Sequence, residues 1–344
     1  MVDISKNNPR LLGIEIGGTK LQVGLGHGDG RLIALERCRA EPSRGAAGIL
    51  EKIQGATDHL LEKCGVSPKD LDVVGIGFGG PVDSDRGVVV LSNQITGWDG
   101  YPLVEWTRQN LGVDRVVLRN DAAAAALGEA RYGAGVGFDP VLYLTIGSGV
   151  GGGLIIDGEI YRGSGRGSIE IGHLIVEDFE GSTRDETVGP RKTLENIASG
   201  WSIAREGRRL VTEIRGGVKL DSASPLTRLC GGDSSRITSE MVAQAASEGD
   251  PGAEQILSNA RIALGRALAH AITLLSPRRI ILGGGVSRIG EESWFEPIRE
   301  EIDRRVFSPF GGTYDLVPAA LGEEVVVHGA LALALDAFRR NQAT

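Results

Sequence analysis

The chain has 344 residues, enough for two domains, and its composition is typical of a folded globular protein. Its formal net charge of −8 disfavours binding to nucleic acid or to an anionic membrane through bulk electrostatics. The three cysteines lie far apart and form no CxxC pair, so the sequence predicts neither a disulfide framework nor a thiolate metal site. The N-terminus is polar and lacks a signal peptide or a membrane span, and we therefore expect a cytoplasmic protein.

Glycine is the one overrepresented residue, with 52 copies, about twice the average usage. Many glycines gather in three turns, at residues 17–18, 147–153 and 283–285, and each turn follows an apolar run that predicts a strand. Ligands of open α/β sheets bind at such strand ends. If the three turns converge, two of them could hold the phosphates of a nucleotide and the third its adenosine. The chain has no GxxxxGK[ST] motif, which excludes a P-loop enzyme.

In the N-terminal part of the chain, apolar runs that are typical of strands alternate with segments whose apolar residues recur at helical spacing. Strands are expected at residues 11–16, 21–25, 73–77 and 116–119, and helices at 45–64 and 122–131. The first two strands flank the glycine turn at residues 17–18. A GxGxxG spacing also follows the third strand, but Pro81 and a polar loop come after it, so it is not a nucleotide-fold signature.

The central glycine turn lies between two apolar strands, at residues 141–146 and 154–156. Its glycines match the GxGxxG spacing of a dinucleotide site, but that fingerprint requires a helix after the glycines. Because a strand follows, and then a hairpin turn at residues 157–158, a Rossmann fold is disfavoured. The turn can still bind a phosphate through its backbone N–H groups, or it can be a tight β-turn without a ligand.

Both halves of the chain open with the same plan, since residues 14–17 align with residues 144–147 as strand, glycine turn and returning strand. We interpret this as an internal duplication that gives two domains. The second half predicts helices at residues 193–210, 241–248, 253–275, 291–306 and 327–340, strands at 279–282 and 315–320, and a polar surface excursion at 211–238. The interleaving of strands and helices predicts an α/β fold.

Five polar side chains beside these elements are candidates for chemistry. Asn120 and Asp121 stand where a strand meets a helix and suit an N-cap, whereas a functional Asp121 would be a general base and Asn120 would hydrogen-bond a polar substrate. Glu170 and His173 could bind a hydroxyl-rich ligand, or His173 can be an ordinary buried histidine, and no further His or Cys stands at metal-ligand spacing. Glu195 lies near a helix start, where a carboxylate suits the dipole without any ligand.

Taken together, these segments resemble the ROK family of sugar kinases and related repressors, within the superfamily of actin- and hexokinase-like ATPases. The resemblance covers nearly the whole chain in the family's order, and as a set the motifs are highly specific. The matching segments are GIEIGGTK, GIGFGGPVD, the loop with Asn93, RNDAAAAALGEA, LTIGSGVGGG, EIGH, LENIASG, IILGGGVS and HGALALAL.

The resemblance implies an α/β fold of two actin-like (ribonuclease H-like) domains around a central cleft, which closes on a sugar and Mg²⁺·ATP. The small domain would comprise residues 1–120 with the C-terminal helix at 327–344, and the large domain would comprise residues 121–326. The resemblance also implies a homodimer or homotetramer that binds a small sugar and ATP, with no nucleic acid or membrane as partner.

The resemblance assigns roles to individual residues. Asp121 matches the family's catalytic base, which takes the proton from the 6-hydroxyl of the sugar. Together with Asp121, the sugar-contacting positions are Gly80, Asn93, Asn120, Glu170, His173 and Glu195. The first phosphate turn matches Gly17, Gly18, Thr19 and Lys20, the second matches Thr145, Gly147, Ser148 and Gly149, and the adenosine motif matches Gly283, Gly284, Gly285 and Val286.

Two departures from the family pattern concern metals. The family carries CxCGxxGC before the LENIASG-like segment and binds a structural zinc together with the EIGH histidine, whereas Glu186, Val188 and Thr193 stand at the cysteine positions here. We therefore predict no structural zinc and a role for His173 with the sugar alone. Glu15 stands where the family commonly has Asp, so it could contact Mg²⁺ near the ATP phosphates with a reach longer by one methylene.

The resulting prediction is an ATP-dependent phosphotransferase of carbohydrate metabolism that acts on the 6-hydroxyl of a hexose, with glucose as the leading substrate, hence a glucokinase of glycolysis. An N-acetylhexosamine kinase, such as one for N-acetylmannosamine, and a fructokinase are alternatives, because they share the sugar contacts. Polyphosphate as donor is disfavoured, because no basic run flanks the glycine turns. A non-catalytic sugar sensor is also disfavoured, because the first phosphate turn begins at Gly17 and leaves no room for an N-terminal helix-turn-helix domain.

Overall fold

The structure of the chain is a computed structural model that describes residues 8–92, 95–163, 169–176, 192–212 and 224–342. It is a mixed α/β structure with two five-stranded sheets. No helix among the described residues combines the length and the apolarity that a membrane span requires.

The first sheet has the strand order β3-β2-β1-β4-β7. Its strands are β1 (Leu11–Ile16), β2 (Lys20–Gly26), β3 (Leu32–Arg39), β4 (Val73–Phe78) and β7 (Val116–Asn120). Strand β1 is antiparallel to β2 and parallel to β4, and β4 is parallel to β7. Every residue of β1 and β4 is buried, which is why both strands have continuous apolar runs rather than alternating ones.

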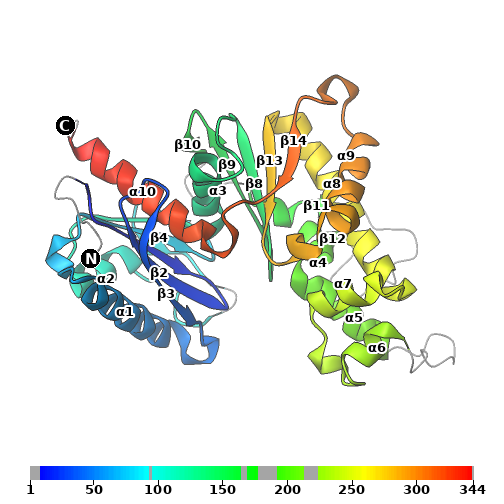
Figure 1. Ribbon diagram of the computed structural model, residues 1–344, viewed down its shortest axis with the longest axis horizontal. Helices are drawn as coiled ribbons and strands as arrows, with labels where there is room; N and C mark the ends of the chain where they lie inside the picture. Colours follow the sequence, from blue (N-terminus) through cyan, green and yellow to red (C-terminus); the bar gives the residue numbers. More distant parts are fainter. Residues whose placement is uncertain (1–7, 93–94, 164–168, 177–191, 213–223, 343–344) are drawn as a thin grey trace. The chain divides into compact units, whose positions relative to one another are not determined.

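Helices cover both faces of this sheet (Figure 1). They are α1 (Gly45–Cys64), α2 (Leu103–Leu111) and α10 (Val325–Gln342). Leu12 and Ile14 belong to one buried cluster with α1 and α2, whereas Leu11 packs in a second cluster with α10. On the α10 side, a Cβ on Gly75 would lie only 1.9 Å from the carbonyl oxygen of Ala330. Glycine in β4 therefore lets the backbone of α10 lie directly on the sheet.

The second sheet, with the order β10-β9-β8-β13-β14, repeats the plan of the first. Its strands are β8 (Val141–Ile146), β9 (Val150–Ile156), β10 (Glu159–Ile160), β13 (Arg279–Gly283) and β14 (Asp315–Pro318). In both sheets three strands that are consecutive in the sequence occupy one side, and strands that arrive after a crossover follow on the other, with β13 parallel to β14. The shared order supports the interpretation of an internal duplication.

The chain divides into two compact units, which we call unit 1 and unit 2. Unit 1 comprises Met1–Tyr143, Gly153–Ile169 and Ala319–Thr344, and unit 2 comprises Leu144–Gly152 and Glu170–Pro318. The predicted boundary at residues 120/121 falls inside unit 1, because helix α3 (Asp121–Tyr132) packs tightly against α10. A Cβ on Gly329 of α10 would lie 1.8 Å from the carbonyl oxygen of Ala124 in α3.

Unit 2 contains most of the helices of the second half. They are α4 (Leu194–Ala198), α5 (Gly200–Thr212), α6 (Pro225–Leu229), α7 (Ser239–Ser247), α8 (Pro251–Leu275) and α9 (Glu296–Asp303). The helix predicted at residues 193–210 is interrupted at Ser199, whose backbone is extended with φ −68° and ψ 155°. The helix predicted at 291–306 begins with a π-helical turn at Glu291–Phe295 and continues as α9.

The predicted surface excursion at residues 211–238 is wrong for its described part. Helix α6 packs against α7, and the side chains of Leu226, Cys230 and Ile237 are fully buried. Glycine and polar residues at 231–236 separate Leu226 and Cys230 from Ile237, so the sequence shows no continuous apolar pattern that would place all three in the core. Residues 213–223 lie outside the described residues.

Candidate functional site

The first glycine turn joins β1 to β2 in unit 1. The N–H of Gly17 donates to the carbonyl of Lys20 at 3.0 Å, and the N–H of Gly79 donates to the carbonyl of Ile16 at 2.8 Å. A Cβ on Gly79 would lie 3.2 Å from Oδ2 of Asp121 and equally close to the carbonyl oxygen of Ile16. The structure therefore brings together the predicted phosphate turn, which also contains Gly18 and Thr19, and the predicted catalytic base.

The start of α3 positions Asp121. Asn120 is the N-cap, and its Oδ1 accepts the N–H groups of Ala122 at 2.9 Å and Ala123 at 3.2 Å. Its Nδ2 donates to the carbonyl of Gly80 at 3.2 Å, while Oδ1 of Asp121 accepts the N–H of Ala122 at 2.8 Å. Of the two cap candidates in the sequence, Asn120 is thus the one that caps the helix, and Asp121 follows it as the first helical residue.

Lys20 is anchored at the first glycine turn by Glu15. The ammonium of Lys20 lies 3.2 Å from Oε1 of Glu15 and donates to the carbonyl of Glu323 at 2.6 Å. Burial raises the pKa of Glu15 to about 7, although Lys20 lowers it, and the negative charges of Asp121 and Glu323 raise it further. The turn therefore carries a buried carboxylate and a fixed ammonium beside Asp121.

These carboxylates fit a magnesium ion that arrives with a nucleotide. Mg²⁺ usually keeps several waters and binds one or two carboxylates together with substrate phosphates. Glu15 and Asp121 lie close enough for their charges to interact, which gives such a pair of carboxylates next to the turn. Among the described residues no group of three or more His, Cys, Asp and Glu side chains could hold a metal ion without a substrate. Glu186 and Val188, two of the three residues at the zinc-cysteine positions, lie outside the described residues, so the absence of zinc stays a prediction.

The second glycine turn joins β8 to β9, and in unit 2 it is bonded at both ends. The N–H of Gly147 donates to the carbonyl of Gly149 at 2.9 Å, and the carbonyl of Gly147 accepts the N–H of Gly200 at 2.7 Å. The N–H of Val150 donates to Oε2 of Glu195 at 2.8 Å. The predicted phosphate turn and the predicted sugar contact Glu195 are therefore in direct contact.

The second and third turns each have an open glycine. A Cβ placed on Gly147 or on Gly285 would meet no atom within 4 Å. Thr145 and Ser148, the predicted hydroxyl donors of the second turn, are half-buried. An anion can thus approach the backbone N–H groups of these turns closely.

The third glycine turn borders a cavity in unit 2. Gly283 ends β13, and Gly284 has φ +86° with its Cα against the backbone of Ile146, where a Cβ would lie 2.4 Å from the carbonyl oxygen. Gly285 and Val286 line a cavity of about 370 Å³, which is within the range of small-molecule sites. Its other lining residues are Ser239, Glu240, Ala243, Gln244, Ala246, Ser247, Glu254, Leu257, Arg288, Ile289 and Ser293.

The polar side chains of this cavity were not predicted from the sequence. Glu240 and Gln244 come from α7, and Arg288 comes from the 3-10 turn after Gly285. They belong to no motif, and on an amphipathic helix such residues are indistinguishable from a solvated face. The one available signal was the glycine motif itself, which predicted a ligand at this strand end.

The predicted sugar contacts Glu170 and His173 lie on one short turn of unit 2. The N–H of His173 donates to the carbonyl of Glu170 at 3.0 Å, and a Cβ on Gly172 would lie 2.1 Å from the carbonyl oxygen of Val150. This turn therefore packs on the same residue that Glu195 contacts. Both side chains are exposed, so the alternative of a buried structural histidine is wrong. Asn93 lies outside the described residues.

Comparison with known proteins gives the same family from sequence and from structure. Residues 11–337 match the sequence model of the ROK family. The glucokinase of Thermotoga maritima is 32% identical over 324 residues, which cover 94% of this chain and 96% of the relative. The xylose repressor of Caldicellulosiruptor bescii is 25% identical over 336 residues, which cover 98% of this chain and 80% of the repressor.

The structure is also similar to a solved member of the family. The crystal structure of a ROK family glucokinase from Streptomyces griseus in complex with glucose and AMPPNP is 32% identical, with a TM-score of 0.76 over 95% of this chain and 99% of that chain. This similarity confirms the predicted α/β fold with two actin-like domains. Sequence motifs, sheet order and relatives agree, and the chain therefore belongs to the ROK family.

Proposed function

We propose that this chain is an ATP-dependent sugar kinase that phosphorylates the 6-hydroxyl of glucose. The observation that carries the proposal is the position of Asp121, at the start of α3 and beside the first glycine turn. The glucokinases of Thermotoga maritima and Streptomyces griseus, both 32% identical over most of the chain, support glucose as the substrate.

Asp121 would act as the general base of the transfer. Its carboxylate would accept the proton of the attacking hydroxyl, whose oxygen then bonds to the terminal phosphorus of ATP while the bond to ADP breaks. Phosphoryl transfer depends mainly on positioning and on stabilisation of charge. The N–H groups of the first and second glycine turns and the ammonium of Lys20 would hold the phosphates. A bound Mg²⁺, held through Glu15, would neutralise phosphate charge.

Fixed polar groups would bind the sugar hydroxyls. Asn120 donates one amide N–H to Gly80 and has a second for the sugar. The exposed Glu170 and His173 and the carboxylate of Glu195 would supply acceptors and a donor, together with Asn93. The cavity beside Gly285 would hold the adenosine.

Several further expectations belong to this proposal. We propose a cytoplasmic homodimer or homotetramer without zinc. A second function, that of a sugar sensor, has one observation in its favour, the similarity to the xylose repressor of Caldicellulosiruptor bescii over 98% of the chain.

An assay of ADP release with a sugar panel tests the proposal. Purified protein with Mg²⁺ and ATP would be given glucose, N-acetylmannosamine, N-acetylglucosamine, mannose and fructose, with Asp121→Asn as the control. Turnover on glucose that is lost in the variant supports a glucokinase, and turnover on another sugar changes only the substrate. Sugar binding by calorimetry without turnover on any sugar would favour the sensor.

A further inference from the structure

Glu195 contacts the second glycine turn as well as being a proposed sugar ligand. Its Oε2 accepts the N–H of Val150, the residue directly after the turn, at 2.8 Å. We propose that Glu195 positions this turn for the phosphates of the nucleotide and thereby couples sugar binding to nucleotide binding. The inference rests on the proposed sugar-kinase function and adds a positioning role to it.

Gly149 shows how closely the carboxylate lies on the turn. A Cβ on Gly149 would be 2.5 Å from Oε2 and 3.3 Å from Cδ of Glu195, so any side chain there would displace the carboxylate. Gly147, two residues earlier, has no atom within 4 Å of its Cβ position. The absence of a side chain therefore has a different effect at each position. At Gly147 it leaves space for a ligand, and at Gly149 it leaves space for the carboxylate of Glu195.

The helix that carries Glu195 begins with a firm cap. Thr193 and Asn196 form a reciprocal capping box at the start of α4, in which Oγ1 of Thr193 accepts the N–H of Asn196 at 3.3 Å. Glu195 lies in this first turn, so the capping box fixes the backbone from which the side chain of Glu195 reaches Val150.

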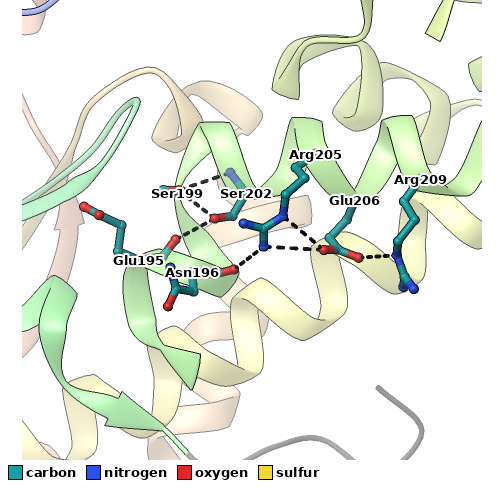
Figure 2. Close-up of polar contacts among 7 residues, drawn as sticks. All are labelled: Glu195, Asn196, Ser199, Ser202, Arg205, Glu206 and Arg209. Atoms are coloured by element: carbon teal, nitrogen blue, oxygen red, sulfur yellow. Dashed lines mark hydrogen bonds and ion pairs between the residues drawn. The ribbon is translucent and has the colours of Figure 1, made fainter. Parts of the chain in front are cut away.

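The junction between α4 and α5 holds Glu195 from the other side (Figure 2). Oγ of Ser202 donates to the carbonyl of Glu195 at 2.8 Å, and Oγ of Ser199 donates to Oγ of Ser202 at 3.0 Å. The guanidinium of Arg205 donates to the carbonyl of Asn196 at 3.0 Å, and Glu206 links Arg205 to Arg209 along α5. The two helices therefore form one connected support.

Helices α4 and α5 are hydrogen-bonded to both ends of the second glycine turn. Gly200, the first residue of α5, donates its N–H to the carbonyl of Gly147 at 2.7 Å, and Glu195 of α4 accepts the N–H of Val150. A Cβ on Gly200 would lie 2.9 Å from the same carbonyl oxygen, so the helix start is pressed against the turn. The conformation of the turn thus depends on where Glu195 is held.

The two oxygens of Glu195 permit both roles at once. Oε2 accepts from the backbone, and Oε1 can accept a hydroxyl of the sugar, because a carboxylate accepts several hydrogen bonds. Hydrogen bonds to a charged acceptor are strong, so a bound sugar would restrict the carboxylate and with it the N–H of Val150. By linkage, a nucleotide on the ordered turn must then tighten sugar binding by the same factor.

Nucleotide affinity in four proteins tests the coupling. Binding of Mg²⁺·AMPPNP would be measured by calorimetry, with and without saturating glucose, for the wild type, Glu195→Ala, Glu195→Gln and the control Glu170→Gln. We expect glucose to tighten nucleotide binding to the wild type about fivefold or more. Glu195→Ala should weaken nucleotide binding about tenfold without glucose and abolish the glucose effect.

The two glutamine variants separate the roles. Glu195→Gln keeps an oxygen that can accept the N–H of Val150, so nucleotide affinity without glucose should stay within about twofold of wild type while the KM for glucose rises. Glu170→Gln should also raise the KM for glucose and leave nucleotide affinity unchanged. Unchanged nucleotide affinity in Glu195→Ala, or an equal loss in Glu170→Gln, would overturn the coupling.

A double-mutant cycle with Gly149 adds a test that does not depend on the sugar. Gly149→Ala should weaken nucleotide binding in the wild type, because its methyl group displaces Glu195, and should cost less than about twofold in the Glu195→Ala background. Equal losses in both backgrounds contradict the proposal. If the wild type phosphorylates no sugar, the proposed function is wrong. If the wild type phosphorylates a sugar but the effects of Gly149→Ala and Glu195→Ala simply add, only the coupling is rejected.

Discussion

At the scale of single residues, the start of α3 separates a structural role from a chemical one. Asn120 takes the cap with its Oδ1 and binds Gly80 with its Nδ2. Asp121 is therefore not needed as the cap, and its Oδ2 lies on the side of Gly79 and the first glycine turn. The sequence alone does not tell which of the two residues caps the helix. The geometry of the helix end shows that Asn120 does.

Asp121→Asn should lower turnover by a factor on the order of 10²–10⁴, the usual contribution of a general base. The amide preserves size and hydrogen bonding, so glucose affinity and the melting temperature should change little. Steady-state kinetics and calorimetry measure these quantities, with Asp58→Asn on the surface of α1 as the matched control. Near-normal turnover in Asp121→Asn would reject the base.

The buried carboxylate of Glu15 predicts a pH dependence of stability. Its pKa is raised from an ordinary value of about 4.5 to about 7, so the folded protein binds more protons than the unfolded chain between these values. The contribution of Glu15 to the free energy of unfolding must therefore fall as pH rises through this window, because this carboxyl group ionises at lower pH in the unfolded chain.

Glu15→Gln should remove this fall. The difference in the free energy of unfolding between variant and wild type should grow in favour of the variant from pH 5 to pH 7.5, by at most about 3 kcal/mol. Urea denaturation at several pH values gives the difference, and the exposed Glu62→Gln on α1 is the control. Parallel pH profiles for wild type and Glu15→Gln would mean that Glu15 ionises normally.

At the scale of elements, glycine decides how closely helices pack. Gly329 of α10 lies against the backbone of α3, and Gly75 of β4 lies against α10. Gly55 of α1 has the same residue type in a helix but no neighbour within 4 Å of its Cβ position. Glycine is therefore required at residue 329, where the helices touch, whereas a larger residue would fit at residue 55.

Gly329→Ala and Gly55→Ala should shift stability in opposite directions. The Cβ at residue 329 would lie 1.8 Å from the carbonyl oxygen of Ala124, so α10 must move and the variant should lose about 3 kcal/mol or more. Gly55→Ala gains helix propensity without a clash and should add about 0.5–1 kcal/mol. Chemical denaturation of both variants tests the contrast, and a loss of similar size at both positions would contradict it.

At the scale of the whole molecule, the proposed sugar contacts divide between the two units. Gly80, Asn120 and Asp121 belong to unit 1, and Glu170, His173 and Glu195 belong to unit 2. Each set is positioned inside its own unit, by the start of α3 in one and by the residues around Val150 in the other. The proposed sugar contacts are therefore far apart in the sequence.

Amide hydrogen exchange with and without glucose tests the sugar contacts that are proposed for each unit. Saturating glucose should slow amide exchange about tenfold or more in peptides that contain residues 79–81 of unit 1 and residues 171–174 of unit 2, because a ligand suppresses local opening. Mass spectrometry with and without glucose measures the effect, and peptides from α1 serve as the unprotected control. A lack of protection in either peptide would reject the sugar contacts that are proposed for that unit.

The α/β class, most strands and helices, the three glycine turns and the family could be predicted from the amino-acid sequence alone. This was possible because apolar runs, helical periodicity and glycine clusters are local patterns that follow from backbone geometry and burial. The sequence predicted the ends of elements less well, as at Ser199 and at the π-helical turn before α9, where tertiary packing overrides propensity.

The contacts of individual side chains became visible in the folded structure and could not be predicted. The structure showed that Asn120 rather than Asp121 caps α3, that Glu195 lies on Gly149, and that Leu226 and Ile237 are core residues. It also revealed the cavity beside Gly285, whose polar side chains come from helix faces without a motif. These facts join residues that are distant along the chain, and a contact of that kind depends on how elements pack, which no local pattern encodes.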